Sequence, residues 1–242
     1  MITLGIDLSS QPEQTATCFV RWDGEVVIRE PVVGASDEDL SAAIPQADKV
    51  GIDVPLGWPD AFVTAVASYQ LGQKWPGPHS DPRLRLRETD RFVWSKIGRP
   101  PLSVSTDKIA MPAMRAAWLL SNLADPSDRI GASRIVEVYP AAALVRWGFD
   151  ASRYKGEKGR SIRLALVEAF EDRIRGWVRL DGAVRDKCLA SDNAFDALVA
   201  ALVARAAAEG LCDEVPSSCV EVAHREGWIA LPGKDSLERL AS

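Results

Sequence analysis

Two strand-like apolar runs in this chain end in the same three residues, Gly-Ile-Asp. The first covers residues 2–8 and places Asp7 in GIDLSS, and the second covers residues 49–54 and places Asp53 in KVGIDVPLGWP. Short apolar runs of this kind predict buried β-strands. An aspartate at a strand end often forms a turn with its own backbone. The alternative is a shared site, since the ends of neighbouring parallel strands meet at one edge of a sheet.

The residues between the two runs predict how the strands are connected. Residues 17–22 and 25–33 are further strand-like runs, and the Asp23-Gly24 pair between them is typical of a tight hairpin. Residues 36–43 predict a short helix, with Ser36 as its N-cap and three acidic residues in its first turn. The predicted order is βββαβ, which indicates a mixed α/β fold.

The middle of the chain differs in composition from the rest. From about residue 55 to 131 it is rich in Pro, Gly, Trp and Arg, with helical patches at 62–71 and 113–123. Regular patterns return as a strand at 134–139, helices at 161–175 and 192–209, and short elements at 219–222 and 227–231. Because the middle lacks an apolar pattern large enough for its own core, we interpret it as an insertion at about 58–131 in a single domain of residues 1–242.

The segment DNAFDALVAALVARAAA predicts a helix that is buried on most sides, because almost every residue after its first turns is apolar or small. Those first turns carry Asp192 and Asp196, whose i, i+4 spacing places both on one helix face. Two like charges near a core are costly unless a cation or a proton compensates them. For Asp192 a simpler interpretation is equally good, since an acid in the first turn of a helix is favoured by the helix dipole.

Together the two strand-end aspartates and the acidic helix start predict a cluster of three or four carboxylates. Such a cluster can hold one or two hard divalent cations through oxygen ligands, with Mg²⁺ or Mn²⁺ as the expected ions. Two metals about 3.5–4 Å apart can stabilise the attacking and leaving oxygens of a phosphoryl displacement. The pattern therefore points to phosphodiester chemistry.

Several motifs together resemble one family over nearly the whole chain. They are GIDLSS, GIDVPLGWP, RETDRFV, PAMRAAW, EVYPAA, SDNAFDALVAALVA and EGWIALP. They are similar to the motifs of "domain of unknown function 429", whose members are generally described as predicted RNase H-like nucleases. The resemblance implies an RNase H-like mixed sheet flanked by helices, with an irregular Pro/Arg/Trp-rich insertion after the fourth strand. It also makes Asp7, Asp53, Asp192 and Asp196 the catalytic metal ligands.

The chain departs from the RNase H pattern at two places. RNase H proper has a glutamate on its first helix, whereas Glu38 and Asp39 here equally suit the solvated start of a helix. RuvC-type junction resolvases, which the acidic helix start resembles most, separate their late acids by three residues rather than four. These departures concern the number of metals more than the fold.

Four further residues are candidates for substrate binding: Arg87, Asp90, Arg115 and Glu137. An arginine beside an acidic cluster offers a two-pronged contact to phosphate. Glu137 is an acid inside an otherwise apolar strand, so it is either a site residue or the buried partner of an arginine. For Arg87, Asp90 and Arg115 the alternative is likewise an internal ion pair.

The charge of the chain limits how it can bind nucleic acid. The formal net charge of −5 opposes attraction over the whole surface, because phosphate binding is driven by positive charge. Two local basic patches are candidates, RLRLRETDRFVWSKIGR and SRYKGEKGRSIR, although such runs are often solvated faces. We therefore expect a structured or single-stranded nucleic acid as partner, bound through a local patch.

The remaining composition concerns location. No apolar run has the roughly twenty residues of a membrane span, and the first residues lack the basic start of a secretory signal. The four cysteines form no C-x-x-C pair. We expect a cytoplasmic protein that does not associate with membranes.

The leading functional prediction is a Mg²⁺- or Mn²⁺-dependent nuclease. The first alternative is an actin-like ATPase or a small-molecule kinase of the same fold lineage, which also begins with a G-I-D-type phosphate turn. Against it, the chain has no clear second glycine-rich phosphate segment. The second alternative is a non-catalytic nucleic-acid-binding module with a structural acidic cluster.

Overall fold

The structure is a computed structural model, and it describes residues 1–78, 80–123 and 128–241. Six strands form one mixed sheet. They are β1 (Ile2–Asp7), β2 (Ala16–Asp23), β3 (Glu25–Ile28), β4 (Val32–Val33), β5 (Lys49–Asp53) and β6 (Ile135–Glu137). The order across the sheet is β3-β2-β1-β5-β6, and β4 pairs with β2. The first three strands are antiparallel neighbours, whereas β5 runs parallel to β1, and β6 runs parallel to β5.

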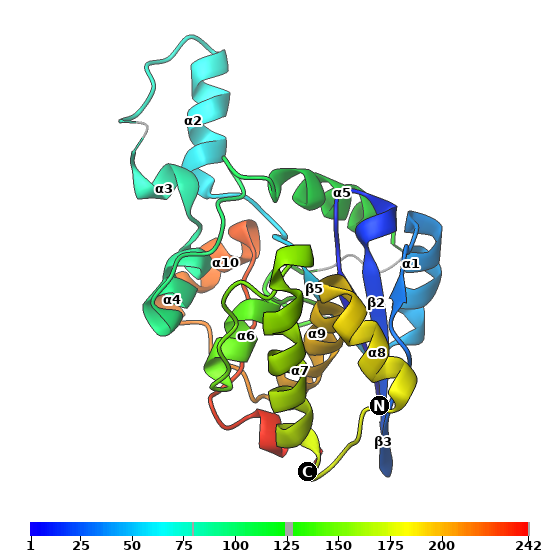
Figure 1. Cartoon of the computed structure of the whole chain (residues 1–242). Helices are drawn as coiled ribbons and strands as arrows, with labels where there is room; N and C mark the ends of the chain where they lie inside the picture. The colour runs from blue at the N-terminus through cyan, green and yellow to red at the C-terminus, as the bar shows by residue number, and fades with distance from the viewer. Residues whose placement is uncertain (79, 124–127, 242) are drawn as a thin grey trace.

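Helices cover both faces of this sheet. They are α1 (Asp37–Ala43), α2 (Asp60–Gln70), α3 (Pro82–Arg85), α4 (Glu88–Ile97), α5 (Ala110–Ser121), α6 (Pro140–Arg146), α7 (Arg160–Ile174), α8 (Gly182–Ala190), α9 (Asp192–Ala208) and α10 (Val220–Glu226). Short 3₁₀ turns occur at Pro12–Gln14, Ile44–Gln46, Glu157–Gly159, Ser217–Cys219 and Leu237–Arg239. In Figure 1, α7, α8 and α9 lie on one side of the sheet, and α1 and α5 lie on the other. The predicted α/β class, a mixed sheet flanked by helices, is confirmed.

The two faces of the central strands differ because side chains alternate along a strand. Leu4 and Ile6 of β1 point into a core shared with α1 and α5. In β5 the aligned residues Val50 and Ile52 face the same core. The opposite face is covered by α9, which packs directly against β1, β2 and β5. This alternation determines which side of the sheet each strand-end aspartate faces.

The predicted elements of the first 54 residues are largely confirmed. The hairpin turns at Gly24, which has a φ of 70°, and α1 begins with a capping box between Ser36 and Asp39. The predicted single strand at 25–33 is wrong in one respect, because it is divided into β3 and β4. Pro31 lies between the two strands, and proline has no N–H group to donate to a sheet.

The segment 58–131 contains α2, α3, α4 and α5, and of its residues 79 and 124–127 lie outside the described part of the chain. In Figure 1, α2 and α3 (cyan) project away from the sheet. By contrast, α5 buries Ala113, Ala116 and Leu119 in the core beneath the sheet, and α4 buries Val93. The helical patches predicted at 62–71 and 113–123 are confirmed as α2 and α5. Part of this segment is integral to the core, although we interpreted it as an insertion without an apolar pattern of its own. That residues 1–242 form a single domain stays a prediction.

Four helices were absent from the sequence prediction: α3, α4, α6 and α8. The sequence of α4 is strongly charged, and its fully buried residues are Thr89, Asp90 and Val93. Its ends are nevertheless well defined, because the backbone N–H of Arg87 donates to Asp90 Oδ2 at 2.9 Å and Gly98 closes the helix with a φ of 77°. Within the described ranges, no helix is both long and apolar enough to cross a membrane.

Candidate metal centre

The repeated Gly-Ile-Asp has a common structural cause in both strands. Gly5 aligns with Gly51 and Asp7 with Asp53 in the parallel pairing of β1 and β5. A Cβ atom on Gly5 would lie 1.9 Å from the carbonyl oxygen of Ala197 in α9, and one on Gly51 would lie 2.5 Å from that of Ala200. Both glycines therefore allow the backbone of α9 to touch the sheet, and each aspartate, two residues further on, faces the same side.

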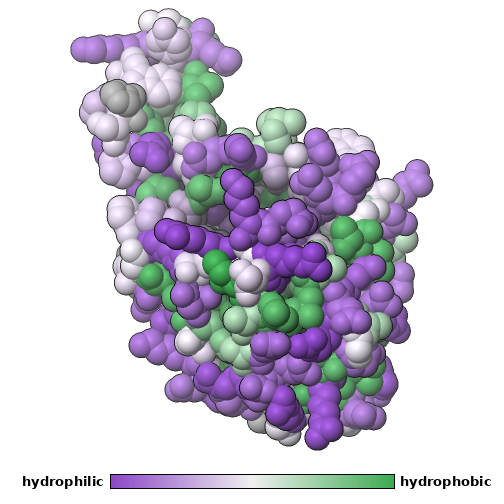
Figure 2. Space-filling view, in the orientation of Figure 1, coloured by the Kyte–Doolittle hydropathy of each residue, from purple (hydrophilic) through white to green (hydrophobic). Residues whose placement is uncertain are grey.

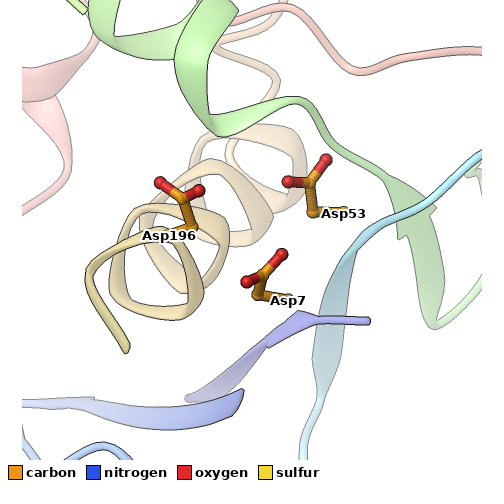
Figure 3. Close-up of side chains that lie close together, drawn as sticks. All are labelled: Asp7, Asp53 and Asp196. Atoms are coloured by element: carbon orange, nitrogen blue, oxygen red, sulfur yellow. The ribbon is translucent and has the colours of Figure 1, made fainter. Parts of the chain in front are cut away.

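Helix α9 supplies the third carboxylate of the site. Ser191 caps the helix by accepting a hydrogen bond from the backbone N–H of Ala194. Asp196, one turn into the helix, is completely buried. One carboxylate oxygen from each of Asp7, Asp53 and Asp196 can be chosen so that all three lie within 4.8 Å of one another. Figure 3 shows the carboxylates of this triad, one from each of β1, β5 and α9, pointing into a common space.

Asp192, the fourth predicted ligand, lies outside this group of three. Its side chain is 21 % exposed, and its Oδ1 lies 3.6 Å from Nη1 of Arg163. It remains close enough to raise the pKa values of Asp7 and Asp196 by repulsion. Asp192 lies in the first turn of α9, where the helix dipole stabilises a negative charge. Its role as a metal ligand stays a prediction.

The electrostatics of the triad favour protonation or a bound cation. Burial raises the pKa of Asp7 well above its usual value, the nearby Lys155 ammonium partly opposes this rise, and Asp196 and Asp53 add to it. Burial also raises the pKa of Asp53 to about 7, with smaller contributions from Asp196 and Glu137. Burial likewise raises the pKa of Asp196. Three acids that resist ionisation together are the environment that a hard divalent cation relieves.

A short loop that precedes α7 provides partners for Asp196. The hydroxyl of Tyr154 donates to Asp196 Oδ1 at 2.6 Å, and the Lys155 ammonium lies 2.6 Å from Oδ2. Although burial opposes the charged form, Asp196 and its neighbours raise the pKa of Lys155 well above its usual value. Arg153, beside them, adopts a left-handed backbone with a φ of 59°, which is strained for a residue other than glycine. We call residues 153–155 the cationic loop.

In the sequence, Arg153 and Lys155 are recognisable only as parts of a basic patch. The contact of Lys155 with Asp196 was not predicted. Their charge was the one available signal. Arg163, from the same patch, is buried and holds the loop, because its Nη1 donates to the carbonyl oxygen of Tyr154 at 2.8 Å.

The structure joins three of the four predicted substrate-binding residues in a buried ionic cluster. Nη1 and Nη2 of Arg87 donate to the two oxygens of Glu137 at 2.8 and 2.7 Å. Arg87 Nη2 also donates to Asp90 Oδ1 at 2.9 Å. All three side chains are buried, and burial raises the pKa of Glu137 while Arg87 opposes that rise. This is the internal ion pair that was the alternative interpretation of these residues.

Glu137 also supports the turn that follows Asp53. Its Oε2 accepts a hydrogen bond from the backbone N–H of Leu56 at 2.9 Å. The buried ionic cluster therefore links β6 and the start of α4 to the strand end that carries a site carboxylate.

Arg115 lies elsewhere, on α5. Its Nη1 donates to the carbonyl oxygen of Ser9 and to the hydroxyl of Thr15, both at 2.6 Å, and its Nη2 lies 2.7 Å from Asp37. Arg115 thus ties α5 to the segment after β1, and it does not line the cavity described next. Substrate binding by Arg115 stays a prediction.

A cavity of about 440 Å³ opens over the triad. Asp7 and Asp53 line it, as do Tyr154 and Lys155, the two partners of the buried Asp196. The buried ionic cluster forms another part of the wall. Figure 2 shows this side of the molecule hollowed below the projecting α2 and α3, with hydrophilic residues gathered around the hollow.

The donor set fits a hard divalent ion. Only carboxylate oxygens approach one another in the triad, and neither sulfur nor imidazole takes part. All-oxygen sites suit Mg²⁺ and Mn²⁺. Asp7, Asp53 and Asp196 are the residues that would hold such an ion.

One family model matches residues 5–220 of the chain, and its description is "Protein of unknown function (DUF429)". The chain belongs to this family. The DUF429 match includes all three carboxylates, the cationic loop and the buried ionic cluster. It ends at Val220, the first residue of α10. No curated protein and no solved structure matched the chain.

Proposed function

We propose that this chain is a divalent-metal-dependent nuclease, which hydrolyses phosphodiester bonds of nucleic acid at the carboxylate triad. The observation that carries the proposal is the convergence of Asp7, Asp53 and Asp196, with one oxygen of each within 4.8 Å of the others, beneath a cavity of about 440 Å³. Three buried acids so close together are costly unless a proton, a cationic side chain or a bound ion compensates them. Lys155 pairs with Asp196, and a metal ion that enters from the cavity would compensate the remaining charge of the triad.

The strand arrangement supports an RNase H-like fold as part of this proposal. The antiparallel strands β1 to β4 precede α1, and β5 and β6 then add in parallel on the other side of β1. The predicted order was βββαβ, and the observed order differs from it by the division of the third strand into β3 and β4. The site lies where β1 and β5 end, as the resemblance also implied.

The residues of the chain have separable roles in the proposed reaction. Asp7, Asp53 and Asp196 would hold Mg²⁺ or Mn²⁺. When bound, such an ion supplies Lewis acidity and neutralises charge on the phosphate. Tyr154 fixes one oxygen of Asp196 through its hydrogen bond. Lys155 offers an ammonium group that lines the cavity, where it can contact a phosphate oxygen.

The cysteines support the cytoplasmic location that we include in the proposal. All four are free thiols, which is typical of proteins in reducing compartments.

Cleavage of labelled DNA and RNA oligonucleotides with Mg²⁺ or Mn²⁺ tests the proposal. We expect the wild-type protein to cleave at least one of these substrates only when the metal is present. Asp7→Asn should lower the rate by about 100-fold or more, because it removes a ligand of the reacting centre.

Asp186→Asn is the matched control, since Asp186 is an exposed aspartate on α8 that does not line the cavity. It should leave the rate unchanged. Absence of cleavage by the wild type under all of these conditions, or full activity of Asp7→Asn, would rule the proposal out.

A further inference from the structure

Apolar side chains line part of the cavity over the triad. Five of them, which we call the apolar wall, come from the segment that joins α4 to α5 and from the ends of those helices: Ile97, Pro101, Leu102, Ile109 and Pro112. Leu102 is 57 % exposed. Tyr139, at the start of α6, contributes a partly exposed ring. A cavity lined by both apolar and charged side chains can bind a ligand with a flat apolar part and an anionic part.

The positive groups of the cavity are few. Arg99, Arg153 and Lys155 line it and are exposed, and Lys155 is also paired with Asp196. In the part of the chain that the structure describes, Arg99 and Arg153 form no ion pair or side-chain hydrogen bond, so their guanidinium groups can bind an anion. Arg87 also lines the cavity, but its donors are engaged by Asp90 and Glu137. Three cations can contact one or two phosphates, whereas duplex binders commonly make many more phosphate contacts.

The recess of the triad favours a flexible strand over a rigid duplex. Asp196 is completely buried, and Asp7 is partly so. A volume of about 440 Å³ falls in the range of small-molecule pockets.

From these observations we infer that the cavity receives one nucleotide of a flexible single strand. The inference rests on the proposed nuclease function and specifies its substrate class. The base contacts Tyr139 and the apolar wall, and the phosphate lies between the triad and the side chains of Arg99, Arg153 and Lys155. Stacking on an aromatic ring is largely independent of base identity, so this arrangement binds single strands with little sequence preference.

Binding measurements on Asp7→Asn protein test the inference without interference from cleavage. The probes are a labelled eight-nucleotide oligothymidylate, a duplex with the same number of phosphates, and thymidine monophosphate as competitor. We expect the single strand to bind at least about 10-fold more tightly than the duplex. The monophosphate should displace it.

Two variants in the Asp7→Asn background locate the bound strand. Replacing Arg99 and Arg153 with glutamine should raise the Kd of the single strand by about 10-fold or more, and Tyr139→Ala should raise it by a similar factor. The matched control replaces Arg21 and Arg179, exposed arginines that do not line the cavity, with glutamine. It should change the Kd by less than about 2-fold. Thermal melts confirm that each variant is folded.

Equal or tighter binding of the duplex, or binding that neither cavity variant weakens, would overturn the inference even if the wild type cleaves nucleic acid. Conversely, a wild type that cleaves nothing but binds the single strand in the cavity would refute the nuclease proposal and leave the binding site established.

Discussion

Asp7 and Asp53 occupy the same register position on the neighbouring parallel strands β1 and β5, and both face α9. Each follows a glycine by two residues, and those glycines are the points at which α9 touches the sheet. The repeated Gly-Ile-Asp is therefore one structural unit used twice. Its glycine admits the helix, its isoleucine enters the opposite core, and its aspartate enters the site.

The contact between α9 and the sheet should be sensitive to a single methyl group. A Cβ atom on Gly5 would lie 1.9 Å from a backbone oxygen of α9 and 2.3 Å from a backbone nitrogen, so neither neighbour can rotate away. Gly5→Ala should lower the free energy of unfolding by at least about 3 kcal/mol. Urea denaturation measures this value. Gly182→Ala, at a position with no atom within 4 Å of an added Cβ, should change it by less than about 1 kcal/mol.

The pKa of Asp53 predicts that the metal-free protein becomes less stable as the pH rises. Its pKa is about 7 in the folded chain, above its usual value of 3.8. Between these values the folded state retains a proton that the unfolded state releases, so the free energy of unfolding falls with increasing pH. One such group contributes up to about 1.4 kcal/mol per pH unit.

This pH dependence can be measured by denaturation in EDTA at several values from about pH 4 to pH 8. Asp53→Asn should flatten the profile, because asparagine does not titrate. A profile that rises with pH over this interval in the wild type would contradict the prediction.

Asp192 and Asp196 should respond differently to the same substitution. Asp196 belongs to the triad, whereas Asp192 lies near Arg163 and is partly exposed. We expect Asp196→Asn to abolish the rise in melting temperature caused by Mn²⁺, which at 100 times the Kd corresponds to about 2.7 kcal/mol. Asp192→Asn should retain most of that rise. Equal losses in both variants would indicate that Asp192 is also a ligand.

Lys155 places a positive charge beside Asp196, where it competes with a metal ion. Lys155→Met should therefore lower the melting temperature of the metal-free protein, since the triad loses its nearest cation. The additional stabilisation by Mn²⁺ should be larger than in the wild type. Differential scanning fluorimetry with and without Mn²⁺ measures both effects. Lys158→Met, which changes an exposed lysine three residues further along that does not line the cavity, is the control.

The buried ionic cluster should contribute far more to stability than an exposed ion pair. Glu137→Gln leaves the buried Arg87 with one carboxylate fewer, which should cost about 3 kcal/mol or more of unfolding free energy. Glu238→Gln removes an ion pair with Arg173 in which both side chains are 43 % exposed, and should cost less than about 1 kcal/mol. Similar losses in the two variants would contradict this assignment.

The sequence predicted most of the sheet and three members of the site, because each left a local pattern. β1 and β5 are continuous apolar runs, and α9 is long and almost wholly apolar after its first turns. Two features left no such pattern. Asp192 and Asp196 lie on one helix face, so which of them enters the triad depends on the position of α9 along the strands, and the contacts at Gly5 and Gly51 help to determine that position. The pairing of Lys155 with Asp196 joins two elements far apart in sequence, and no periodicity indicates it.

The triad takes its members from the first strand, the fifth strand and a helix near the end of the matched range, and no two of them are local neighbours in the chain. A partly folded chain therefore cannot offer all three carboxylates at once. Any ion held by the triad binds the native state alone, so its free concentration shifts the folding equilibrium by mass action. The same three side chains thus couple the availability of the ion to the amount of folded protein.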